Sequence, residues 1–242
     1  MIPKNIFQTH KSIEYLRDNK ELFQCAFSWY KNKGYTYKFF TDAECDSFMK
    51  THYPDIYPLY ASLPLAVMKA DLWRYCVIYK YGGIYADVDT ILMSSPDMFI
   101  MDKELVVSAE HKDHMCQWVF AASPGSPVLK TVIDMVTQRI RLGLRLEKHF
   151  VLNTTGPGIF TAGILEYLRK NTDVVQERKW SYDPSKLHTL NIDTIHVFDH
   201  ETFHSNHVKH LFYGCRNGWM QQRNSLIKKH HKRDGFGLNV FS

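Results

Sequence analysis

Apolar and polar positions recur with two different periods along this chain. Alternating or continuous apolar runs predict β-strands, and apolar residues spaced three and four apart predict helices. Strands are expected over residues 2–9, 35–40, 84–88, 104–109, 117–122 and 195–198. Helices are expected over residues 41–49, 65–81, 128–142 and 156–168. Strands that alternate with helices predict an α/β fold with a mostly parallel central sheet and helices on both faces.

Local signals bound two of these helices. Thr41 and Glu44 have the spacing of a capping box, which predicts a helix start. The longest predicted helix runs to Tyr81, where Gly82 and Gly83 end it. Its apolar residues recur at helical spacing, as expected for a helix that packs against the sheet.

The composition is that of an ordinary globular protein. Of its 242 residues 45% are hydrophobic and 23% are charged, which excludes disordered, collagen-like and coiled-coil chains. We expect one domain over residues 1–242. No apolar run approaches the roughly 18 residues of a membrane span, and the N-terminus lacks a signal-peptide pattern. The sequence therefore predicts a cytoplasmic protein, with a luminal domain trimmed from a longer chain as the alternative.

A basic tail, about residues 226–242, carries much of the excess positive charge. Thirty basic and twenty-five acidic residues give a net charge of +5. We interpret the tail as a solvated segment; peripheral contact with a membrane surface is the alternative, and no nucleic-acid partner is predicted. Five cysteines without metal-site spacing predict buried free thiols.

Two acids stand at the end of the apolar strand over residues 84–88. Asp87 and Asp89 are two apart, so their carboxylates are expected on one side of the strand. Hard oxygen ligands at that end of an α/β sheet suit Mg²⁺ or Mn²⁺ shared with substrate phosphates. A solvated turn is the common alternative for such a pair. Ile84 and Tyr85 precede the acids in an apolar strand. Burying unpaired carboxylates beside such a strand costs free energy, so a bound cation is favoured.

A second charged pair lies on the preceding helix. Asp71 and Arg74 are three residues apart and share one helix face. Taken alone, they are interpreted either as an intrahelical ion pair or as part of a ligand site.

Together these motifs resemble glycosyltransferase family 32, whose members carry a DxD sugar-binding region. The segment from Lys69 to Thr90 resembles the family's core motif, and the run from Ile2 to Thr9 resembles its opening strand. Three later stretches are similar to the branch of initiating α-1,6-mannosyltransferases: residues 116–129, 155–161 and 208–214, the last followed by Trp219. The resemblance implies a GT-A type, Rossmann-like fold that binds a nucleotide-sugar.

The resemblance also implies a role for each matching residue. Asp87 would hydrogen-bond ribose and sugar hydroxyls, Asp89 would ligate the metal, and Asp71 and Arg74 would hold the donor sugar. His210 matches the family's late metal ligand, with His207 as a rival. The matching positions near the nucleotide are Gln8, Thr9, Trp29, Tyr85, Asp87 and Trp219.

The function implied by the resemblance is retaining transfer of a hexose, with Mn²⁺ or Mg²⁺, to a glycan or glycolipid hydroxyl. GDP-mannose is the favoured donor, and a UDP-hexose remains open. Two other functions, a binding module and a phosphohydrolase, are the alternatives. A degenerate nucleotide-sugar or carbohydrate-binding module is disfavoured by the intact set of acids, arginine and histidine. A metal-dependent phosphohydrolase would need a richer carboxylate cluster.

Overall fold

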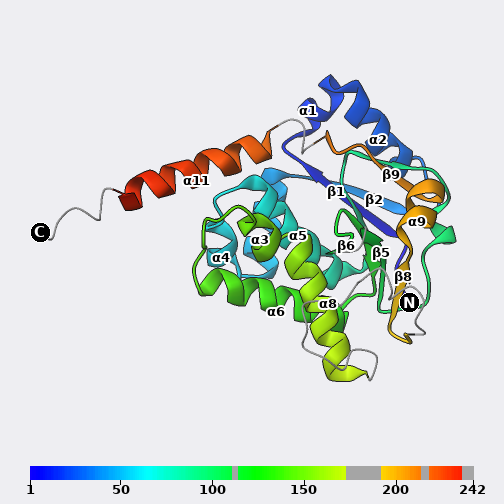
Figure 1. Ribbon diagram of the computed structural model, residues 1–242. Helices are drawn as coiled ribbons and strands as arrows, with labels where there is room; N and C mark the ends of the chain where they lie inside the picture. Colours follow the sequence, from blue (N-terminus) through cyan, green and yellow to red (C-terminus); the bar gives the residue numbers. More distant parts are fainter. Residues whose placement is uncertain (111–113, 173–191, 214–217, 236–242) are drawn as a thin grey trace, which may run out of the picture.

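The computed structural model describes residues 1–110, 114–172, 192–213 and 218–235, except for the side chains of 231–235 (Figure 1). Its main sheet has the strand order β2-β1-β3-β7-β5-β6, and β8 pairs with β5. The strands are β1 (Asn5–His10), β2 (Thr36–Thr41), β3 (Gly83–Ala86), β5 (Leu105–Glu110), β6 (His114–Met115), β7 (Val119–Ala122) and β8 (Ile195–Phe198).

Strand direction in this sheet is mostly parallel, as predicted. β1 pairs in parallel with β2 and β3, and β5 pairs in parallel with β8. β7 runs antiparallel between β3 and β5, and β6 runs antiparallel to β5. β7 is reversed because it follows β5 after a short connection and not after a crossover helix.

Helices cover both faces of the sheet (Figure 1). They are α1 (Ile13–Asp18), α2 (Lys20–Tyr30), α3 (Asp42–His52), α4 (Tyr57–Ala61), α5 (Ala66–Tyr81), α6 (Pro127–Arg141), α7 (Phe150–Thr154), α8 (Pro157–Asn171), α9 (His200–Asn206) and α11 (Trp219–Gly235), with the 3₁₀ turn η1 (Pro96–Met98). The capping box predicted at Thr41 is present, since the Thr41 hydroxyl accepts from Glu44 N and the Glu44 carboxylate accepts from Thr41 N.

Successive side chains of the strands point into two separate cores. In β1, Phe7 joins a core formed with α3 to α8, and Ile6 joins a second core with α2, η1 and α9. In β3, Tyr85 and Ile84 divide in the same way. This period of two is the reason that apolar residues on both strand faces are buried.

The junction between α5 and β3 depends on glycine. Gly82 ends the helix with φ +63°, and Gly83 follows with φ +115°. A Cβ atom on Gly83 would lie 2.6 Å from the backbone oxygen of Asn5, so only glycine fits where β3 joins β1. The strand begins one residue earlier than predicted and ends at Ala86, so the predicted end at Val88 was wrong.

A small second sheet joins two distant segments of the chain. β4 (Thr90–Leu92) pairs antiparallel with β9 (Val208–His210), and Thr90 lies opposite His210. Leu211 N extends the pairing by donating to Asp89 O at 3.0 Å. The sequence patterns did not predict this ladder, because strands this short carry little periodic signal.

The predicted basic tail begins inside α11, a helix that extends from the body of the protein (Figure 1). Leu226 and Ile227 pack against the core, whereas Lys228 and Lys229 are exposed. Residues 236–242 lie outside the described residues. Among the helices that the structure describes, none combines the length and the apolar character needed to cross a membrane. The cytoplasmic location stays a prediction.

The predicted free thiols are found at four of the five cysteines. Cys25, Cys45, Cys76 and Cys116 are unpaired and buried. Cys215 lies outside the described residues.

Candidate active site

Asp87 and Asp89 lie in a tight turn between β3 and β4. Asp87 O accepts from Thr90 N at 3.2 Å, from the Thr90 hydroxyl at 2.6 Å and from Gln8 Nε2 at 3.1 Å. Asp87 N donates to Trp118 O at 2.7 Å. The turn, and not alternation along a strand, therefore brings the two carboxylates together.

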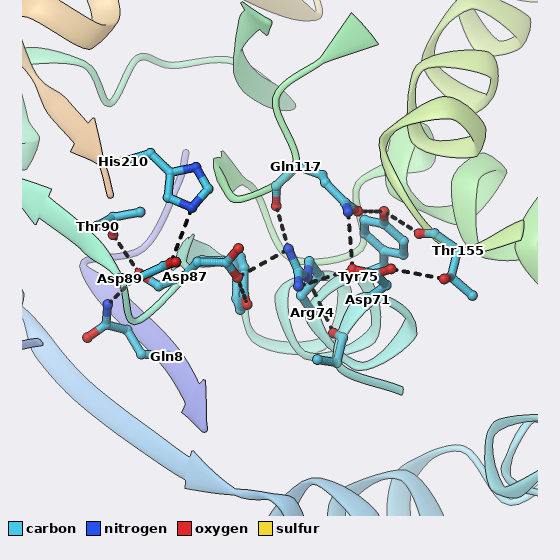
Figure 2. Close-up of polar contacts among 12 residues, drawn as sticks. Gln8, Asp71, Arg74, Tyr75, Asp87, Asp89, Thr90, Gln117, Thr155 and His210 are labelled. Carbon is cyan, nitrogen blue, oxygen red and sulfur yellow. Dashed lines mark hydrogen bonds and ion pairs between the residues drawn. The ribbon is translucent and has the colours of Figure 1, made fainter. Parts of the chain in front are cut away.

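His210 reaches the acidic pair through the β4–β9 ladder. Its Nε2 lies 3.2 Å from Asp89 Oδ1 (Figure 2). The imidazole packs against the rings of Trp118 and Phe212, at 4.5 and 4.1 Å between centroids. Phe212 has φ +54°, a strained value for a bulky residue, at the point where the chain leaves β9. The ring of His210 is thus oriented from both sides.

Arg74 bridges Asp71 and Asp87 (Figure 2). Its NH2 lies 3.1 Å from Asp71 Oδ1, and its NH1 lies 3.3 Å from Asp87 Oδ1. NH1 also donates to Gln117 O at 3.1 Å. Burial alone would lower the pKa of the guanidinium, but Asp87, Tyr85 and Asp71 outweigh it and raise the pKa. Arg74 therefore stays charged and holds both acids in one arrangement.

Asp71 is enclosed behind Arg74. Only 1% of the residue is exposed, and its carboxylate accepts from Gln117 Nε2 at 3.1 Å and from the Thr155 hydroxyl at 2.9 Å. Burial raises its pKa to about 6, although Arg74 and the two hydrogen bonds act in the opposite direction. Its oxygens are fully engaged within the protein, so Asp71 orients Arg74.

Asp87 has a more open position than Asp71, with 27% of its side chain exposed. Burial raises the pKa of its carboxyl, and Arg74 opposes the shift. The Tyr85 hydroxyl donates to Asp87 Oδ1, and the Arg74 guanidinium lies 4.5 Å from the Tyr85 ring centroid. These contacts leave Asp87 held in place with one side free for a ligand.

A pocket lies at the carboxyl end of β1 and β3, and it is faced by Arg74, Asp87, Asp89 and His210. Its lining comes from both halves of the chain: Thr9, His10, Lys11, Leu22, Asp42, Ala66, Val67, Ala70, Arg74, Tyr85, Asp87, Val88, Asp89, His210, Tyr213 and Trp219. Ligand sites of open α/β sheets lie at this edge. The pocket combines carboxylates with a lysine, an arginine, two imidazoles and three aromatic rings.

The amino-acid sequence matches a known family over this region. The description "Glycosyltransferase sugar-binding region containing DXD motif" applies to residues 4–106, which hold β1, α5 and the Asp87–Asp89 turn. This part of the chain, residues 4–106, matches the glycosyltransferase family. The family predicted from the motifs is thereby confirmed.

Similar proteins include two initiation-specific α-1,6-mannosyltransferases. The Candida albicans protein is 27% identical over 222 residues, which cover 74% of this chain and 57% of that protein. The Schizosaccharomyces pombe protein is 28% identical over 219 residues, which cover 78% of this chain and 52% of that protein. The predicted similarity to this branch is confirmed. The chain spans little more than half the length of these relatives.

Two further proteins are similar to this chain. Inositol phosphoceramide mannosyltransferase 1 of Schizosaccharomyces pombe is 32% identical over 106 residues, which cover 43% of this chain and 33% of that protein. The solved structure of the PaToxG glycosyltransferase superposes with a TM-score of 0.52 at 20% identity, over 69% of each chain. The predicted glycosyltransferase fold is confirmed by this superposition.

Several residues expected near the nucleotide do line the pocket. They are Thr9, Tyr85, Asp87 and Trp219. Trp219 stands at the start of α11, which places an aromatic ring beside the pocket although it is far from Tyr85 in the sequence. Their contacts with a nucleotide stay predictions.

Trp29 and Gln8, expected near the nucleotide, are not among the residues that line the pocket, and their contacts with a nucleotide stay predictions. Trp29 is fully buried in the core, and its Nε1 donates to Thr90 O at 3.2 Å and to the Thr90 hydroxyl at 3.0 Å. Gln8 is fully buried, holds Asp87 O and accepts from the Tyr37 hydroxyl at 2.9 Å. Both residues hydrogen-bond to the acidic turn or to the residue that follows it, and neither lines the pocket. Asp71, expected at the donor sugar, is likewise enclosed.

His207, the rival of His210, faces away from the acids. Its Nδ1 lies 2.8 Å from the Ser94 hydroxyl, and its ring packs against Phe99 and Phe203. Burial lowers the pKa of His207. The two histidines are three apart and β9 begins between them, so only His210 reaches the site.

Sequence reasoning missed the groups that hold Asp71. Gln117 and Thr155 lie in two of the three stretches that resemble the mannosyltransferase branch, but their residue types gave no signal for a role. Tyr75 ties them together, since its hydroxyl lies within hydrogen-bond distance of both Gln117 Oε1 and Thr155 O and can donate to either one. This network passes from α5 to the start of α8 (Figure 2).

The arrangement of Asp87, Asp89 and His210 fits a divalent cation. One ligand atom from each residue lies within 4.8 Å of the others. Ligand atoms around one ion are about 3–4.5 Å apart, because each metal–ligand bond is about 2.0–2.3 Å long. Two carboxylates with an imidazole suit Mn²⁺ better than Mg²⁺, which prefers oxygen ligands alone. The other ring nitrogen, His210 Nδ1, is buried without a hydrogen-bond partner among the described residues.

Proposed function

We propose that this chain transfers a hexose from a nucleotide-sugar to a glycan or glycolipid hydroxyl, with a divalent cation at Asp87, Asp89 and His210. One observation carries the proposal. The β4–β9 ladder brings His210 to the acidic turn at the pocket where Arg74 also ends. A site built from both halves of the chain, with three metal-ligating side chains and one guanidinium, suits the diphosphate of such a donor.

Each residue of the site would bind a different part of the donor. The cation, Mn²⁺ or Mg²⁺, would neutralise charge on the departing diphosphate. Arg74 presents fixed N–H donors toward phosphate or sugar oxygens, and Asp71 keeps it oriented. Asp87 can accept from ribose or sugar hydroxyls on its open side, and Trp219 lines the same pocket as His210.

The donor favoured here is GDP-mannose. Two relatives are named as α-1,6-mannosyltransferases and one as an inositol phosphoceramide mannosyltransferase. These names support mannose as the sugar and a glycan or a sphingolipid as the acceptor. A UDP-hexose remains the competing donor.

We infer a retaining reaction by front-face attack. The acceptor oxygen forms a bond to the anomeric carbon as the bond to the diphosphate oxygen breaks, and the hydroxyl proton passes to the leaving phosphate. Asp71 is unsuited to act as a covalent nucleophile, because its carboxylate is buried and paired with Arg74. A glycosyl-enzyme adduct detected by mass spectrometry would contradict this inference.

The test is release of nucleoside diphosphate from a panel of GDP- and UDP-sugars with Mn²⁺, for the wild type and Asp89→Ala. Turnover of one donor, lost with EDTA and with the substitution, is the expected result. Binding of a donor without turnover, with every acceptor class supplied, would favour the degenerate binding module instead. No binding at all would contradict both interpretations.

A further inference from the structure

A second cavity adjoins the donor pocket on the side away from His210. The two cavities share Thr9, Asp42, Ala66 and Ala70. The second cavity lies among α3, α4 and α5, which contact one another beside the edge strand β2 (Figure 1). Its charged lining residues are Asp42, Asp46 and Lys69.

One face of α5 runs along both cavities. Ala66, Ala70 and Arg74 are four residues apart and therefore share a helix face. Ala66 and Ala70 line both cavities, whereas Arg74 lines only the donor pocket, beside Asp87. The two alanines leave room next to the helix, so an elongated ligand with its phosphates near Arg74 can extend into the second cavity.

The charges of the second cavity discriminate between nucleobases. Guanine presents N1–H and N2–H₂ as neighbouring donors and O6 as an acceptor, and uracil presents a single N3–H between two carbonyl oxygens. A carboxylate only accepts hydrogen bonds, so it matches the two guanine donors and opposes a uracil carbonyl. A lysine only donates, and it matches guanine O6 and the uracil carbonyls alike, so the carboxylate is the group that distinguishes the two bases.

Asp42 is better placed for this contact than Asp46. Asp46 Oδ2 already accepts from the Tyr57 hydroxyl at 2.9 Å. Asp42 is exposed and lies where the two cavities meet. Lys69 stands across the cavity on α5, with its Nζ 5.4 Å from the centroid of the buried Tyr60 ring.

We propose that the second cavity receives the nucleobase of the donor, that Asp42 selects guanine over uracil, and that Lys69 donates to a carbonyl oxygen of the base. The inference rests on the proposed function, since it needs the diphosphate to lie near Arg74 and the acidic turn. It adds the base, and the residues that read the base, to that function.

The experiment measures Mn²⁺-dependent binding of GDP, UDP and xanthosine diphosphate by calorimetry. Xanthine carries a carbonyl in place of the 2-amino group, so it opposes Asp42 but can accept from an amide. The variants are Asp42→Asn and Lys69→Met, with Asp55→Asn as the matched control. Asp55 is an exposed aspartate near α4 that lines neither cavity. Asp42→Asn keeps the helix start, because Thr41 and Glu44 form the capping box.

We expect the wild type to bind GDP at least about tenfold more tightly than UDP or xanthosine diphosphate. Asp42→Asn should weaken GDP binding by about tenfold to a hundredfold, strengthen binding of xanthosine diphosphate and leave UDP almost unchanged. Lys69→Met should weaken GDP and UDP alike, because both bases lose a donor to a carbonyl oxygen, and Asp55→Asn should match the wild type.

Two results would overturn the assignment of the base. If the wild type prefers UDP, or if Asp42→Asn weakens GDP and UDP equally, Asp42 does not select guanine, while the diphosphate site stands. If the wild type binds no nucleoside diphosphate, the proposed function and this inference both fail. Loss of binding in Asp89→Ala confirms that the measured complex is at the donor site.

Discussion

His210 Nε2 lies 3.2 Å from Asp89 Oδ1, although the two residues come from opposite halves of the chain. The contact depends on backbone pairing on both sides of it, between Thr90 and His210 and between Leu211 N and Asp89 O. The closing of the acidic site is therefore coupled to the folding of β9 onto β4.

The first prediction concerns this contact. His210→Ala should lower Mn²⁺-dependent release of nucleoside diphosphate by at least about 100-fold, because a metal ligand is lost. His207→Gln is the control, since His207 bonds to Ser94 and lies outside the pocket. Activity is measured at several Mn²⁺ concentrations. An equal loss in both variants would contradict the assignment of His210 as a ligand.

The second prediction concerns Arg74. Its replacement by methionine should destabilise the protein by about 3–5 kcal/mol, because Asp71 keeps a buried charge without its partner. Arg74→Lys should recover only part of the stability, since an ammonium cannot span Asp71, Gln117 O and Asp87 together. Urea unfolding at pH 7 measures both effects. Full stability of Arg74→Lys would show that one of these contacts is dispensable.

The third prediction concerns the pH dependence of stability. Burial raises the pKa of Asp71 in the folded protein to about 6, above its ordinary value of 3.8. The folded state then binds this proton more tightly than the unfolded chain, so stability falls as pH rises from about 4 to about 6. Relative to Asp71→Asn, which lacks the titration, the wild type should lose up to about 3 kcal/mol over that range.

The opposite pH dependence of the wild type relative to Asp71→Asn would also be informative. If Arg74, Gln117 and Thr155 outweighed burial, the pKa of Asp71 would be lowered. The wild type would then gain stability relative to Asp71→Asn as pH rises. The sign of the slope between pH 4 and 6 therefore decides whether burial or pairing governs this carboxylate.

The fourth prediction separates two tryptophans that the sequence alone could not distinguish. Trp29→Phe should cost about 0.5–1.5 kcal/mol of stability through the lost hydrogen bond to Thr90, with little change in nucleotide affinity. Trp219→Ala should weaken nucleotide binding with a small effect on stability, because its ring borders the pocket. Calorimetry with GDP or UDP, paired with thermal unfolding, measures both. Equal loss of affinity in both variants would contradict these placements.

The sequence by itself determined the elements that depend on neighbouring residues. The period of α5, its end at Gly82 and the capping box at Thr41 all involve residues within a few positions of one another. The acidic pair and the Asp71–Arg74 pair were found for the same reason. Their resemblance to a known motif then supplied the family.

Only the tertiary structure decided which of these residues share the site. The ladder that brings His210 to Asp89, the burial of Asp71 behind Arg74 and the role of Trp29 beneath Thr90 all join distant segments. Residue type does not encode such partners, because a buried tryptophan and a ring beside a ligand look alike in a sequence. Contacts across the sheet are set by packing of whole elements, and that packing exists only in the folded chain.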